Sequence, residues 1–145
     1  KRPLTIDDLD TWNRITESII SDDGSLCGFV FEPWDGDPSL KIYQGSGAEK
    51  ISFPCASGIK ITSDSRYVIF TITTPKQKLT ELKLKKTKKE DMPVNSLGIY
   101  NEVDNSTDTI IRIKSFKVPE KWPGWIAYQC EPLKEAASRG KNVQQ

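Results

Sequence analysis

The most informative absence is histidine, which occurs at none of the 145 positions. Hydrolases of the Ser-His-Asp and Cys-His types need histidine as the base that takes the nucleophile's proton, and histidine is also the commonest transition-metal ligand. The sequence also has no Gly-x-Ser-x-Gly elbow and no phosphate-binding glycine loop. We therefore expect this chain to be no enzyme on its own, with no catalytic residue, no metal site and no other cofactor.

Cysteine is scarce and odd in number: Cys27, Cys55 and Cys130, with no Cys-x-x-Cys spacing. This count indicates neither a disulfide framework nor a zinc site. Cys27 lies in an apolar segment, where a small buried hydrophobe is the usual role. The sequence leaves the roles of Cys55 and Cys130 open.

Excess charge and long apolar runs are also missing. The chain has 21 basic and 20 acidic residues, so composition indicates neither a nucleic-acid partner nor a membrane surface. No apolar run approaches the roughly 20 residues that span a bilayer, and the chain opens on Lys1-Arg2-Pro3 rather than on a leader peptide. We expect one soluble domain from which any export signal has been removed.

What the sequence does contain is a repeat. Ser21-Asp22-Asp23-Gly24 and Thr62-Ser63-Asp64-Ser65 each lead into a short apolar segment, and these segments reach Phe29 and Phe70, 41 residues apart. A period of this size is typical of four-stranded propeller blades. Ser39–Tyr43 and Ser96–Tyr100 recur in the same way, each followed by a turn and a further strand. Gly124–Tyr128 resembles a third copy of the apolar segment, with Trp125 at the position of Leu26, which favours core packing for this indole.

Turn-forming clusters of Asp, Asn, Gly, Ser and Pro separate these segments, which favours antiparallel strands. Asp22, Asp23, Asp35 and Asp37 all fall in such turns, so turn formation is the preferred interpretation over paired catalytic carboxylates or calcium ligands. Ahead of the strands, Thr5 and Asp8 resemble a capping box, and Ile6, Leu9 and Trp12 lie three apart. These features predict a short helix between Thr5 and Arg14.

The distance from Phe70 to Tyr128 is 58 residues rather than 41, so the second unit carries an insertion. Residues 74–93 are rich in lysine and are predicted to form an exposed helical excursion or a mobile loop. A solvated excursion is the preferred interpretation over a polyanion or anionic-lipid contact, because aromatics that could stack on bases are missing there. The predicted organisation is an N-terminal segment (1–18), a partial propeller (19–131) and a polar tail or truncated linker (132–145).

Tryptophan is the remaining candidate for a binding role. Trp34 and Trp122 fall in predicted turns and are the candidate surface contacts. Exposed indole faces can stack on sugar rings. The alternative to a propeller segment is therefore a self-standing β-sandwich module that binds glycans or a protein through these two residues.

Several of these stretches together resemble exported serine peptidases of the prolyl oligopeptidase family from Bacteroidetes-type bacteria. The resemblance rests on the Ser-Asp turns, on Lys85–Pro93 leading into Ser96–Ile99, and on Lys114–Pro119 with Gly124–Tyr128, and it covers roughly residues 3 to 130. It implies an N-terminal propeller that shapes access to a C-terminal hydrolase domain, which carries the catalytic Ser, Asp and His. It also implies a periplasmic or secreted location.

The resulting prediction is an all-β chain: about two blades of a TolB-like propeller plus a strand of a third, led by a short helix. Its expected partners are the remaining blades and the hydrolase domain of a parent peptidase, and the parent's peptide substrate. Because so few blades cannot close a ring, the isolated chain is expected to self-associate.

Overall fold

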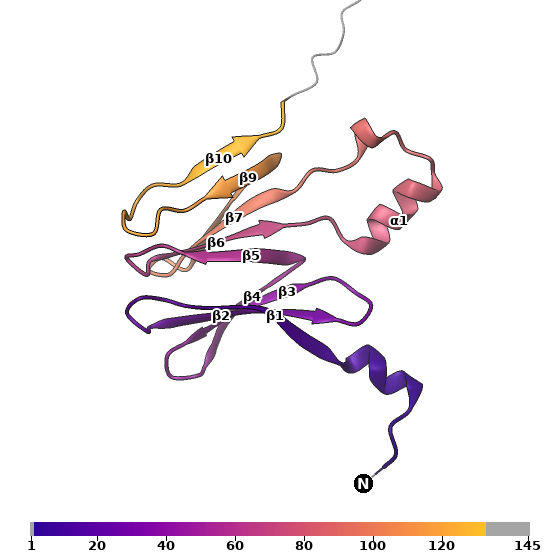
Figure 1. The fold of residues 1–145 in the computed structure, drawn as a ribbon, viewed down its shortest axis with the longest axis horizontal. Helices are drawn as coiled ribbons and strands as arrows, with labels where there is room; N and C mark the ends of the chain where they lie inside the picture. Colours follow the sequence, from indigo (N-terminus) through magenta and orange to yellow (C-terminus); the bar gives the residue numbers. More distant parts are fainter. Residues whose placement is uncertain (1, 133–145) are drawn as a thin grey trace, which may run out of the picture.

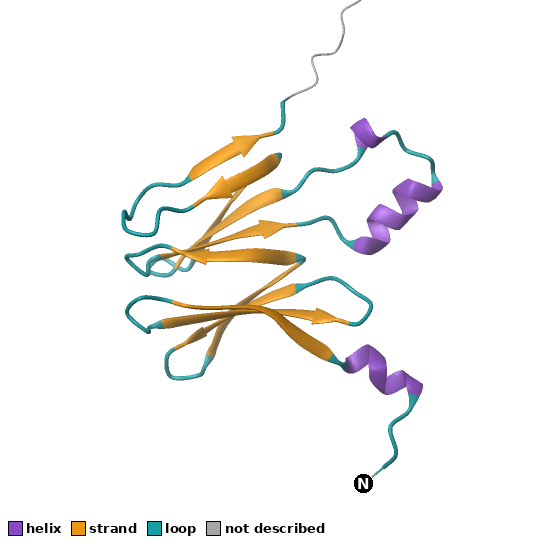
Figure 2. Cartoon of the chain, in the orientation of Figure 1, coloured by secondary structure: helices purple, strands orange, loops and turns teal. Residues whose placement is uncertain are grey.

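The computed structural model describes residues 2–132 and consists of antiparallel sheets stacked face to face (Figure 1). Sheet 1 has the order β1 (Asn13–Ile20), β2 (Leu26–Pro33), β3 (Ser39–Gln44) and β4 (Glu49–Pro54). Sheet 2 has the order β5 (Ala56–Ile61), β6 (Tyr67–Ile72), β7 (Ser96–Asn101) and β8 (Ser106–Ile110). Sheet 3 contains β9 (Ile113–Lys117) and β10 (Ala127–Cys130). Strands account for most of the regular secondary structure of the described residues, which confirms the all-β class (Figure 2).

The N-terminal helix is shorter than its sequence pattern indicates. The 3-10 helix η1 (Ile6–Thr11) has the predicted Thr5–Asp8 capping box, but β1 begins at Asn13. The extension to Arg14 is wrong because Arg14 pairs across the sheet with Glu32, and their side chains form an ion pair at 3.0 Å. The boundary expected between residues 18 and 19 consequently falls inside β1.

Sheet 2 contributes side chains to two cores, one on each of its faces. Side chains alternate along a strand, so β6 directs Val68 and Phe70 toward sheet 1 and Ile69 toward sheet 3. The first core, between sheets 1 and 2, is built around Leu26, Val30, Leu40, Ile42, Val68, Phe70 and Tyr100. The second core, on the far side of sheet 2, contains Ile69, Leu97 and Ile113.

The third copy of the repeat differs from its prediction. β10 begins at Ala127, and Trp125, predicted to pack in a core, precedes that strand and is 71% exposed. Cys27 is half-buried rather than fully buried, because it faces away from sheet 2 on the side of sheet 1 that no other described element covers. The stacking order therefore accounts for Cys27, because it decides which faces of the sheets are covered.

Glu17 links the two large sheets through its carboxylate. Its two oxygens accept hydrogen bonds from the backbone N–H groups of Gly58 and Ile59, at 3.0 and 3.1 Å. These donors lie where the β5–β6 register shifts, at a bulge that frees them from the ladder. The Glu17 side chain on β1 therefore accepts hydrogen bonds from backbone N–H groups of β5 that have no acceptor within their own sheet.

We expect Glu17→Ala to lower the free energy of unfolding by about 1–3 kcal/mol, because it leaves two part-buried N–H groups without an acceptor. Urea denaturation measures this loss. The control is Ser18→Ala, the exposed neighbour on the same strand, and an equal loss in both variants would contradict the role of the carboxylate.

The lysine-rich insertion is helical. It lies between β6 and β7 and contains α1 (Lys76–Leu84) and the 3-10 turn η2 (Lys89–Asp91). Figure 1 shows α1 standing away from the sheets, and no residue of α1 is buried. No helix within residues 2–132 is long and apolar enough to cross a bilayer.

α1 ends in a Schellman motif in which lysine occupies the position usually held by glycine. Thr87 N–H donates to Leu82 O at 3.1 Å and Lys86 N–H donates to Lys83 O at 3.0 Å, while Lys86 has φ +52°. A side chain in this left-handed conformation is strained by about 1–2 kcal/mol.

We therefore expect Lys86→Gly to raise the free energy of unfolding by about 1 kcal/mol, measured by urea denaturation. Lys85→Gly is the matched control, since Lys85 has φ −73° and gains nothing from glycine. Stabilisation by both substitutions, or by neither, would contradict the motif.

Candidate functional site

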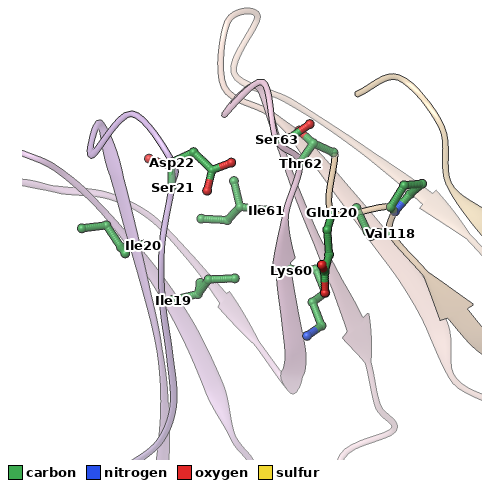
Figure 3. A pocket seen from close by; sticks show the side chains of 11 residues that line it. Ile19, Ile20, Ser21, Asp22, Lys60, Ile61, Thr62, Ser63, Val118 and Glu120 are labelled. Carbon is green, nitrogen blue, oxygen red and sulfur yellow. The ribbon is translucent and has the colours of Figure 1, made fainter. Parts of the chain in front are cut away.

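The turns that the repeat predicts gather at one end of the stacked sheets and border a hollow of about 400 Å³. Figure 1 shows the β1–β2, β5–β6 and β9–β10 connections on the same side of the molecule. Figure 3 shows side chains from these three regions around the hollow. Its wall contains Ile19, Ile20, Ser21, Asp22, Lys60, Ile61, Thr62, Ser63, Val118, Pro119 and Glu120.

Two equivalent turns shape this end. The N–H of Leu26 donates to Ser21 Oγ at 2.9 Å, and the N–H of Tyr67 donates to Thr62 Oγ1 at 3.1 Å. Each hydroxyl in turn donates to an aspartate, Asp23 in the first turn and Asp64 in the second. The turns therefore share one hydrogen-bond design, 41 positions apart.

The same turns require a left-handed residue. Gly24 has φ +70° and Ser65, its counterpart, has φ +59°. The second turn keeps the left-handed conformation although Ser65 carries a side chain where the first turn has glycine.

Asp23 is the titratable group that this design affects most. Hydrogen bonds from the Ser21 hydroxyl, the Ser25 N–H and the Ser25 hydroxyl hold the pKa of Asp23 far below its usual range. A carboxyl whose pKa is lower in the folded than in the unfolded chain stabilises the fold above the unfolded value, about 3.9, and loses that contribution as pH falls below it.

We expect the unfolding midpoint in urea to drop on acidification from pH 5 to pH 2, and to drop less in Asp23→Asn. Asp22→Asn removes the same charge from the neighbouring exposed position and serves as the control. Equal acid sensitivity in Asp23→Asn and the unsubstituted chain would contradict the assignment.

The wall of the hollow combines charged, apolar and hydroxyl side chains. Asp22, Lys60 and Glu120 supply charges of both signs, Ile19 and Ile61 supply apolar surface, and the buried Ser63 Oγ has no hydrogen-bond partner among the described residues. Among residues 2–132 no group of three His, Cys, Asp or Glu side chains is arranged to hold a metal ion.

No cysteine is among the residues that border this hollow. Burial, and secondly the Asp37 carboxylate, raises the pKa of the Cys55 thiol, which disfavours the nucleophilic thiolate. Cys130 is exposed on β10, and all three cysteines are free.

The two predicted surface tryptophans do not meet. Trp34 is 86% exposed and follows β2 at the end that carries α1, while Trp122 is 72% exposed in the β9–β10 connection at the opposite end. The residue near Trp34 is instead Trp12, and together with Leu9 these indoles border a smaller hollow of about 210 Å³. The signal that could have found this pair is the β1–β2 register: Asn13 opposes Pro33, so Trp12 opposes Trp34 one step further out.

Sequence comparisons find no matching protein-family profile and no matching curated protein. Among solved structures, the chain is similar to the acylaminoacyl peptidase of Pyrococcus horikoshii in its orthorhombic crystal form, with a TM-score of 0.53 and 11% identity. The match covers 77% of this chain and only 16% of that chain. At this identity the likeness concerns the fold: the stacked antiparallel sheets of this chain resemble a part of a peptidase structure.

Proposed function

We propose that this chain is a non-catalytic propeller segment of a secreted or periplasmic serine peptidase of the prolyl oligopeptidase family. In this role it shapes or restricts the access of peptides to a hydrolase domain that these residues do not include. The likeness to part of the acylaminoacyl peptidase and the absence of histidine both support this proposal.

The observation that carries the proposal is one uncovered sheet face. Val68, Phe70 and Ile72 of β6 pack against sheet 1, and the residues 41 positions earlier are Cys27, Phe29 and Phe31. Those three lie half-exposed on the outer side of sheet 1, where Phe29 also contacts Tyr43 at 5.8 Å between ring centroids. We refer to Ile15, Cys27, Phe29, Phe31 and Tyr43 as the outer aromatic face. The outer aromatic face thus corresponds, position by position, to the face of sheet 2 that packs against sheet 1. It is therefore suited to pack against a further sheet of the same repeat.

In the parent protein the covering sheet would be another blade. In the isolated chain we expect a second copy to cover the outer aromatic face, so that light scattering at micromolar concentration detects a dimer or larger species. Phe29→Glu is expected to return the chain to monomers, with Thr107→Glu on exposed β8 as the control. A well-folded monomer at that concentration would argue against the partial propeller.

The peptidase parentage has its own test. We expect the natural reading frame to continue into a hydrolase domain with a Gly-x-Ser-x-Gly elbow, and the whole gene product to cleave a proline-containing peptide that the purified chain leaves intact. A reading frame that stops near Gln145, or cleavage by the purified chain, would overturn the proposal.

The exposed indoles support a second candidate, a self-standing module that binds glycans or a protein. Trp12 and Trp34 flank an apolar hollow beside the Arg14–Glu32 ion pair, a mixture of aromatic and polar groups that can take a sugar ring. Quenching of tryptophan fluorescence by oligosaccharides, abolished in Trp34→Ala and retained in Trp122→Ala, would favour this candidate.

A further inference from the structure

A second large hollow, of about 580 Å³, lies between the end of the lysine-rich insertion and the start of sheet 3. Three cationic side chains, Lys89, Arg112 and Lys114, border it together with the single carboxylate of Glu131. The rest of its wall is formed by Met92, Pro93, Val94, Asn95, Ile113 and Pro132. The hollow thus combines a net positive charge with apolar surface, and its size is within the usual range for small-ligand sites.

Arg112 is the unusual residue of this site. It has φ +63°, a left-handed conformation that costs a non-glycine residue about 1–2 kcal/mol. Backbone hydrogen bonds hold it there: Ile113 N–H donates to Asn95 O at 2.8 Å, and Glu131 N–H donates to Arg112 O at 2.7 Å. Such strained residues occur in turns and helix ends, as at Ser65 and Lys86, and also at ligand clamps.

The guanidinium of Arg112 is also incompletely satisfied. Its Nη2 donates to Pro132 O at 2.7 Å, which fixes the side chain, whereas its Nε is buried with no hydrogen-bond partner among the described residues. A buried N–H of a charged group without an acceptor costs free energy, and a shift of the side chain that lets an anion reach Nε would recover it. Arginine is suited to this task because its planar fork matches the oxygens of a carboxylate or phosphate.

The surrounding sequence strengthens the positive field. Residues 76–91 contain seven lysines and three acidic residues, for a net charge of +4, although the whole chain carries only +1. Lys89 is the last of these lysines and borders the hollow directly. Charge concentrated beside a concave apolar surface raises the local concentration of anions.

We propose that this hollow binds a small organic oxyanion, a carboxylate or phosphate attached to an apolar body, with the oxyanion beside Arg112 and the body against Met92 and Val94. The proposal is independent of the parent enzyme, because every group that it uses lies within the described residues.

The test is an NMR titration of the folded chain that follows the arginine Nε–H signals and the backbone amides. The probes are phenyl phosphate, benzoate, inorganic phosphate and the neutral benzyl alcohol. We expect saturable shifts of Arg112 Nε–H and of the amides of Lys89 and Lys114 with phenyl phosphate or benzoate, and the tighter of these two identifies the preferred oxyanion. Inorganic phosphate and benzyl alcohol should bind more weakly, because the first lacks the apolar body and the second lacks the oxyanion.

Arg112→Gln should weaken binding roughly tenfold to a hundredfold. Arg66→Gln removes the same charge from an exposed turn and should leave the affinity within about twofold of the original. If Arg112→Gln does not fold, Lys114→Gln serves in its place with a smaller expected loss. The proposal is overturned if no probe gives saturable shifts, if benzyl alcohol binds as tightly as the anions, or if Arg66→Gln weakens binding as much as the substitutions in the hollow.

Discussion

Phe70→Ala is expected to lower the free energy of unfolding by about 3–5 kcal/mol, the usual cost of removing a buried phenylalanine. The ring is fully buried at the centre of the core between sheets 1 and 2, where its centroid lies 4.5 Å from that of Phe53. It also covers Gly98, its cross-strand neighbour on β7. Removing the ring would therefore leave a cavity between the two sheets. Urea denaturation measures the loss of unfolding free energy.

The repeat supplies a matched control at Phe29, the same residue type 41 positions earlier. Phe29 lies half-exposed on the outer aromatic face, so Phe29→Ala should cost about 1 kcal/mol when the chain is dilute enough to be monomeric. Equal losses at Phe29 and Phe70 would mean that the outer aromatic face is already covered in the isolated chain, contrary to the stacking described above.

The second and third strands of sheets 1 and 2 could be predicted from the sequence because their signals are local. A hydroxyl, an aspartate and a left-handed residue make the turn that precedes β2 and the one that precedes β6, and these residues lie within five positions of each other. Such turn chemistry needs no knowledge of distant contacts.

The first strands were harder to predict because distant residues determine them. β1 is mostly polar, and its Glu17 side chain serves two donors of β5 that are about 40 positions away in the chain. β5 itself contains Gly58 at φ +66° and a register shift, which interrupt the alternation that marks a strand.

The candidate sites show the same division. The acidic turn residues and the exposure of Trp34 could be anticipated from local pattern, whereas the approach of Trp12 to Trp34 depends on β-sheet register. The hollow around Arg112 joins Lys89, Arg112 and Glu131 from three separate segments, and its strained backbone carries no local sequence signal, since arginine gives no hint of positive φ. Prediction from sequence therefore found the turns but not the surfaces that stacking creates.

The close contact between Gly98 and Phe70 leads to the second large expected effect, since an added methyl group at Gly98 has no room. A Cβ at this position would lie 2.4 and 2.5 Å from the Cε2 and Cζ atoms of Phe70, far inside van der Waals contact. We expect Gly98→Ala to lower the free energy of unfolding by about 1–3 kcal/mol, because the buried ring must leave its place between β7 and Phe53.

A double-mutant cycle identifies the cause of this loss. Phe70→Leu shortens the side chain with which an alanine at position 98 would clash. Gly98→Ala should therefore lower the free energy of unfolding clearly less in the Phe70→Leu background than in the original chain. The coupling arises because β7 has no side chain at position 98 and the facing aromatic ring fills that space. An equal cost of Gly98→Ala in both backgrounds would show that the glycine serves the conformation of β7 rather than the packing of Phe70.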